Sequence, residues 1–66
     1  MNDIDQAILY QKTGRLSEAE RIYRRLLAAR SDHPDALHWL GVLALQRGNA
    51  TTAVDLIGRA LAIKPD

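Results

Sequence analysis

Cysteine is missing from this 66-residue chain, so no disulfide, thiolate nucleophile or cysteine-ligated zinc site can form. Phenylalanine is also missing, and the two prolines stand at positions 34 and 65. An excess of one charge is missing too. The formal net charge of +1 gives no long-range electrostatic reason to expect nucleic acid or a membrane surface as a partner.

Long apolar runs are equally scarce. The longest, Leu40–Leu45, is far shorter than the roughly 20 residues that a membrane-spanning helix needs. The first five residues are acidic rather than basic, which does not fit a signal peptide. The hydrophobic fraction of 47% is too high for a disordered tail. We therefore expect a folded cytoplasmic protein.

Catalytic constellations cannot be assembled from the residues present. The chain offers no Ser/His/acid set, no glycine-rich phosphate loop and no pair of buried carboxylates. His33 and His38 are five residues apart, a spacing that does not place both on one helical face, so we expect solvated histidines rather than a metal site. The sequence therefore predicts a protein that is not an enzyme and that uses no cofactor or metal.

A basic stripe of Arg21, Arg24 and Arg25 is the one feature that suggests nucleic acid. Glu20 precedes Arg24 by four residues, which is the favourable orientation for an ion pair along a helix. No aromatic residue interleaves the arginines. We therefore interpret the stripe as a salt-bridged, solvent-facing helix surface.

Helix formers dominate the composition, and their apolar residues recur at helical spacing. This pattern predicts four helices and no strands. The first helix is expected over 3–13, with Asn2 or Asp3 as its cap and Gly14 just beyond its end. The second is expected to begin with a capping box, in which Ser17 and Glu20 satisfy each other's free backbone N–H groups.

The second half of the chain repeats this arrangement. Asp32 is expected to cap the third helix, with Pro34 in its first turn. Asn49 or Thr51 should cap the fourth helix, and Pro65 should mark its end. The turns within each half are about three residues long, so each pair of helices must be antiparallel.

A shift of 34 residues superposes the two halves, with seven identical pairs: Leu9/Leu43, Gly14/Gly48, Ala19/Ala53, Arg25/Arg59, Leu27/Leu61, Ala28/Ala62 and Asp32/Asp66. The glycines fall at the predicted turns. Small residues also recur at Ala7 and Gly41, where they would face Ala19 and Ala53 and allow the helices to approach closely.

A 34-residue period with this layout resembles the tetratricopeptide repeat. The second unit carries the resemblance best, through Leu40-Gly41, Gly48, Ala53, Ile57, Ala60 and Pro65. The first unit fits at Tyr10, Gly14, Ala19 and Tyr23, and departs at Asp3, Gln6, Leu26 and Ser31. The expected fold is all-α: two antiparallel hairpins, over about 1–33 and 34–66, stacked as an α-solenoid fragment in one domain. The Leu37–Pro65 unit also resembles repeats that precede bacterial O-linked glycosyltransferase-like domains.

The resemblance implies a concave groove lined by the first helix of each hairpin, which would bind a protein or peptide partner. The positions that it places there are Ile4, Asp5, Ile8, Gln11, Lys12, Asp35, His38, Trp39, Val42, Leu45 and Gln46. Ile4, Ile8 and Val42 stand where some family members hold a carboxylate with Lys and Asn, so that ligand is not expected. An apolar helix or an extended peptide suits the groove better.

Trp39 has two interpretations. It either packs against a neighbouring helix or another copy of the chain, or it anchors a peptide in the groove.

The far side of the last helix forms a second candidate surface. Val54, Ile57, Leu61 and Ile63 would be covered in a longer stack by the next repeat or by a polar capping helix. The sequence stops at Asp66 without either. We therefore expect a homo-oligomer, or a fragment whose remaining repeats have been removed. The predicted function is a protein-interaction scaffold. The alternatives are a homo-oligomeric assembly module and an N-terminal repeat fragment of a larger, glycosyltransferase-like protein.

Overall fold

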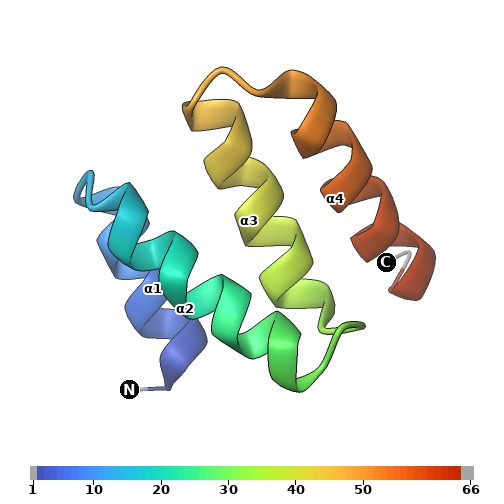
Figure 1. Cartoon of the computed structure of the whole chain (residues 1–66), viewed down its shortest axis with the longest axis horizontal. Helices are drawn as coiled ribbons and strands as arrows, with labels where there is room; N and C mark the ends of the chain where they lie inside the picture. The colour runs from blue at the N-terminus through green and yellow to red at the C-terminus, as the bar shows by residue number, and fades with distance from the viewer. Residues whose placement is uncertain (1, 65–66) are drawn as a thin grey trace.

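The computed structural model describes residues 2–64 and shows four helices in chain order. They are α1 (Asp3–Lys12), α2 (Leu16–Ala29), α3 (Pro34–Gln46) and α4 (Ala50–Ile63). α1 packs on α2, α3 packs on α4, and α3 also lies against α2 and α1 (Figure 1). The all-α fold of two packed hairpins is confirmed, and the described residues contain no strand.

Both turns within the hairpins depend on a glycine. Gly14 and Gly48 have φ angles of +86° and +78°, in the left-handed region that other residues rarely adopt. The following backbone N–H groups, of Arg15 and Asn49, bond back to the carbonyls of Tyr10 and Ala44. This matches the prediction that a glycine stands just beyond the first helix of each unit.

Asparagine caps two of the helices, and at each it is one of the two candidates that the sequence offered. The Asn2 side chain accepts a hydrogen bond from the Asp5 N–H at the start of α1. The Asn49 side chain accepts one from the Thr52 N–H at the start of α4. Each such cap stabilises its helix by about 1 kcal/mol.

The predicted capping box at Ser17 is wrong. α2 begins two residues earlier than this box implies, at Leu16, and its N-cap is Arg15, whose side chain makes no capping hydrogen bond. Ser17 therefore lies inside the first turn, where its hydroxyl cannot act as an N-cap. The Ser17 and Glu20 side chains instead contact Arg47, the C-cap of α3, so this spacing serves the packing of the two hairpins.

Asp32 does not cap α3. The cap is His33, whose Nδ1 accepts a hydrogen bond from the Ala36 N–H at 3.3 Å, with Pro34 at the first helical position. Asp32 pairs with Arg30 in the preceding turn. At the other end of the chain, α4 finishes at Ile63, and the predictions for Pro65 and Asp66 lie outside the described residues.

Small residues let the helices approach closely, as predicted. Ala7, Ala19 and Ala53 are almost completely buried. A Cβ placed on Gly41 would lie 2.6 Å from Ile57 Cγ1 and 3.3 Å from the carbonyl oxygen of Ala53. Only glycine fits the α3–α4 contact at this point without a shift of its neighbours.

The core runs through both hairpins. Its largest fully buried side chains are Tyr23 of α2 and Leu37 of α3. Half-buried apolar residues pack around the buried cluster: Ile4, Tyr10, Leu16, Leu26, Leu27 and Trp39. One continuous core therefore holds the two repeats together and fixes α1 beside α3.

Candidate partner-binding surfaces

A chain of two hydrogen bonds, one buried and one partly buried, ties α1 to both of its neighbours. The Tyr23 hydroxyl donates to Gln11 Oε1 at 2.7 Å, and Gln11 Nε2 donates to Gln46 Oε1 at 2.7 Å. Gln11 is only 4% exposed. Burial raises the pKa of Tyr23 to about 12, so this hydroxyl keeps its proton and remains a donor. Gln11 was predicted to line the groove, but its side chain lies beneath the surface.

The Gln11–Gln46 bond brings one side of α1 next to one side of α3. Residues spaced by three, four or seven positions share a helical side. This spacing identifies the residues of α1 and α3 that lie beside the Gln11–Gln46 bond. They are Ile4, Ile8 and Lys12 from α1, and Trp39, Val42 and Gln46 from α3. All the aliphatic residues and the tryptophan among them are half-buried, while Lys12 and Gln46 are exposed. We call these six residues the groove side.

Trp39 belongs both to the core and to the groove side. Its indole packs against the buried cluster, and its ring edge meets the His38 ring with centroids 5.2 Å apart. It remains partly exposed. Packing against neighbouring helices therefore accounts for part of the indole surface, and the remaining part is open to a partner.

His38 and Leu45 lie apart from the other predicted groove residues. They are seven positions apart on α3, both are exposed, and His38 lines a shallow hollow with Leu61 of α4. They face the end of the stack. The exposed end carries Leu45 from α3 and Val54, Ile57, Gly58 and Leu61 from α4, and we call these five residues the open face.

Exposure on the open face is high for apolar side chains. Val54 is 73% exposed, and Leu45 and Leu61 are each 53% exposed. Ile63 was predicted to share this face. It follows the buried Leu56 by seven residues, so it lies on the core side of α4 and is exposed at the end of the helix.

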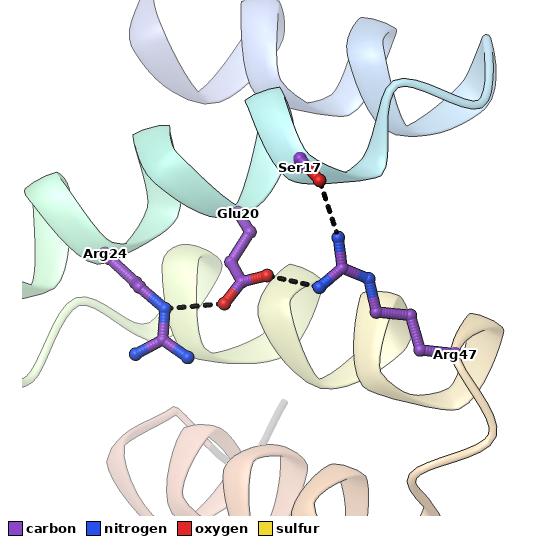
Figure 2. A network of polar contacts seen from close by, with 4 residues as sticks. All are labelled: Ser17, Glu20, Arg24 and Arg47. Carbon is purple, nitrogen blue, oxygen red and sulfur yellow. Dashed lines mark hydrogen bonds and ion pairs between the residues drawn. The ribbon is translucent and has the colours of Figure 1, made fainter.

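An ion-pair network joins the two hairpins (Figure 2). Glu20 accepts from Arg24 Nε at 2.7 Å and also pairs with Arg47, which donates to the Ser17 hydroxyl at 3.3 Å. The hydrogen bond from Arg24 holds the pKa of the Glu20 carboxyl below its usual value; burial opposes this effect and Arg47 reinforces it. The predicted pairing of Glu20 with Arg24 is confirmed.

A hollow of about 220 Å³ lies beside this network, with an apolar floor that includes Leu40, Leu43 and Leu56. Arg24 and Arg47 border it, but both guanidinium groups are already paired with Glu20. Arg25 of the predicted stripe is paired as well, with Asp3, and the neighbouring Arg15 pairs with Glu18. Arg24 and Arg25 of the basic stripe are therefore paired with carboxylates within the fold.

Residues 2–64 hold no group of three or more His, Asp or Glu side chains that could bind a metal ion. The same residues include no helix that is long and apolar enough to cross a membrane.

Comparison with known proteins decides the family. A family model described as "Tetratricopeptide repeat" matches residues 4–66. The chain belongs to the tetratricopeptide repeat family. The chain is also 39% identical over 56 residues to "Cellulose synthase operon protein C" of Xanthomonas axonopodis pv. citri (strain 306). That match covers 85% of this chain and 4% of the relative, and no solved structure matches.

Membership of the family fits the observed packing. In tetratricopeptide repeats, helical hairpins stack and present the first helix of each unit on a concave side, which corresponds here to α1 and α3. The family supports a repeat scaffold for protein–protein interaction. The sequence did not predict the Tyr23–Gln11–Gln46 chain of hydrogen bonds or the Arg47 contacts, because these depend on how one hairpin lies on the other.

Proposed function

We propose that the chain binds a protein segment, as an extended peptide or a short helix, along the groove side. The observation that carries this proposal is the row of half-buried apolar residues shared by α1 and α3: Ile4, Ile8, Trp39 and Val42. Partly exposed aliphatic and aromatic side chains on a rigid surface are typical anchor points for an apolar segment. This role is non-catalytic, and a cytoplasmic location stays a prediction of the sequence.

The charges beside the row favour a particular kind of segment. Lys12 is exposed at one end of the α1 row, and Asp5 is exposed earlier on the same helix. A bound segment with apolar residues in its centre and opposite charges at its two ends would complement both. Its central side chains would supply most of the binding energy, since rim charges contribute little.

A peptide-display selection on the wild-type chain tests this function. Peptides that bind should lose at least tenfold in affinity for Val42→Lys, which places a charge in the apolar row. Val54→Lys is the matched control: the same substitution, on the open face, should leave affinity within threefold. Failure to select any peptide, or equal losses in the two variants, would contradict binding along the groove side.

One observation favours a second function, homo-oligomeric assembly. The open face exposes large apolar side chains, whereas the equivalent positions of the first hairpin lie against α3 and are buried or half-buried. Self-association would remove that surface from water.

A further inference from the structure

The two ends of the stack differ in chemistry. Four positions of the first hairpin lie next to α3, where they are buried or half-buried: Gln11, Glu20, Tyr23 and Leu27. Their equivalents 34 residues later are Leu45, Val54, Ile57 and Leu61. Three of these four pairs change from a polar side chain to a purely apolar one. The open face therefore has no counterpart of the Glu20 carboxylate that pairs with Arg47, or of the Gln11 amide that bonds Gln46.

The opposite end of the molecule is polar. Arg47 and Leu40, seven residues apart, mark the side of α3 that meets α2, since Arg47 contacts Glu20. The equivalent side of α1 carries Gln6 and Thr13, and Asp3 beyond them. Asp3 is exposed and lies 3.6 Å from Arg25. This end is suited to water rather than to an apolar surface.

Head-to-tail stacking of identical copies is therefore unfavourable. It would press Asp3 and Gln6 of one copy against Val54 and Leu61 of the next. A carboxylate and an amide would lose their water without gaining a partner, which is unfavourable, above all for the charged group. A repeated contact of that kind would also extend into open filaments. The apolar surface of one copy is better matched by the same surface of another.

We infer that two copies of the chain pair open face to open face, about a two-fold axis close to Gly58. This geometry deepens the assembly function proposed above and rests on it. In such a pair the two α4 helices cross antiparallel. Val54 stands four residues before Gly58 and Leu61 stands three residues after it, so Val54 of each copy meets Leu61 of the other. The two-fold axis produces this Val54–Leu61 contact twice, so all four side chains are buried in the dimer.

Gly58 suits the centre of this contact. It is exposed, and a Cβ added there would meet no heavy atom within 4 Å, so the chain's own fold does not require glycine at this position. The absence of a side chain lets two helix backbones approach closely. This contrasts with Gly41, whose place is explained by Ile57 and Ala53 within the molecule.

The charges beside the open face are also self-complementary. Asp55 and Arg59 form an i,i+4 pair at 3.9 Å along the edge of the face. They lie on either side of the proposed axis, three residues before Gly58 and one after it. An antiparallel crossing places Asp55 of each copy near Arg59 of the other. Opposite charges then meet at both ends of the contact, as a two-fold arrangement requires.

Sedimentation equilibrium of the full 66-residue chain, from about 1 µM to about 1 mM, tests the pairing. The wild type should fit a monomer–dimer equilibrium, with no larger species at any concentration. Gly58→Arg should weaken dimerisation at least tenfold, because it places two cations at the axis. Ala29→Arg, an exposed control at the end of α2, should leave the dimer constant within threefold. Circular dichroism confirms that each variant is helical.

A charge reversal separates the two-fold geometry from other modes of association. Asp55→Arg should weaken the dimer, because Arg would face Arg59 across the axis. Adding Arg59→Asp to it should restore affinity to within threefold of the wild type. A wild type that stays monomeric to about 1 mM would overturn both the assembly function and its geometry. Species larger than a dimer, a dimer unaffected by Gly58→Arg, or a double variant as weak as the single one would overturn the two-fold pairing alone.

Discussion

At the scale of single residues, the polar side chains between the hairpins determine how the repeats fit together. Gln11 is nearly buried, and both ends of its amide are bonded, to Tyr23 and to Gln46. No buried side-chain nitrogen or oxygen within residues 2–64 lacks a hydrogen-bond partner. A buried polar group costs little when it is satisfied and much when its partner is removed. Removing one partner from the Tyr23–Gln11–Gln46 chain should therefore cause a measurable loss of stability.

Replacing Tyr23 by Phe should destabilise the fold by about 1–2 kcal/mol, because Gln11 Oε1 loses its donor while the amide stays buried. Urea unfolding monitored by circular dichroism measures the change. Tyr10→Phe is the control. Tyr10 is half-buried, and no hydrogen bond to its hydroxyl occurs among the described residues, so its loss should cost less than about 0.5 kcal/mol. Equal effects of the two substitutions would contradict a structural role for the Tyr23 hydroxyl.

Glu20 should make the junction sensitive to acid. Its pKa is lower in the folded state than its usual value of 4.5. The stability it contributes is therefore fully present above pH 4.5 and is lost as the pH falls through the folded-state pKa. We expect Glu20→Gln to be less stable than the wild type at pH 7, and the difference to shrink at pH 3. A difference that is the same at both pH values in urea titrations would contradict this assignment.

At the scale of the helices, close contact between α3 and α4 depends on a glycine that helix propensity alone would disfavour. Gly41 and Gly58 both lie inside helices, but only Gly41 faces a neighbour at short range. Glycine costs a helix interior about 1 kcal/mol relative to alanine. Packing offsets this cost at Gly41, whereas within a single copy nothing offsets it at Gly58.

The two glycines should therefore respond oppositely to alanine. Gly41→Ala should destabilise the fold by about 1–3 kcal/mol, since the new Cβ overlaps Ile57 and approaches the Ala53 carbonyl. Gly58→Ala should stabilise the monomer by about 0.5–1 kcal/mol. Thermal unfolding at low protein concentration compares them.

Combining Gly41→Ala with Ile57→Ala should cost less than the sum of the two single changes, because the overlapping atom is gone. Additive losses would show that the clash with Ile57 is not the cause.

The helix boundaries show where sequence reasoning succeeds. Asn2, Asn49 and the turn glycines were predicted because their chemistry acts within a few residues of chain. The Ser17–Glu20 spacing matched a capping box equally well, but the structure uses both side chains to hold Arg47, which is 27 residues or more away. Local patterns cannot choose between a neighbour in sequence and a neighbour in space.

At the scale of the whole molecule, the 34-residue period predicted the stacking of two hairpins, which the structure confirms, and it suggested two candidate surfaces. It could not sort the residues of α3 between those surfaces. The Gln11–Gln46 bond sets the rotation of α3 against α1, which leaves Trp39 and Val42 on the groove side and turns Leu45 toward the open face. That rotation depends on tertiary packing, so the candidate groove was predicted only in outline.

The central claim is that a protein partner binds along the groove side formed by α1 and α3. Nuclear magnetic resonance tests it most directly, by titrating a peptide selected on the wild-type chain into the ¹⁵N-labelled protein. The largest backbone shifts should fall on Ile8, Lys12, Val42 and Gln46 and on the Trp39 indole N–H, with small changes at Val54 and Leu61. Shifts concentrated on the open face or on the outer side of α2, with the Trp39 indole unmoved, would contradict the claim.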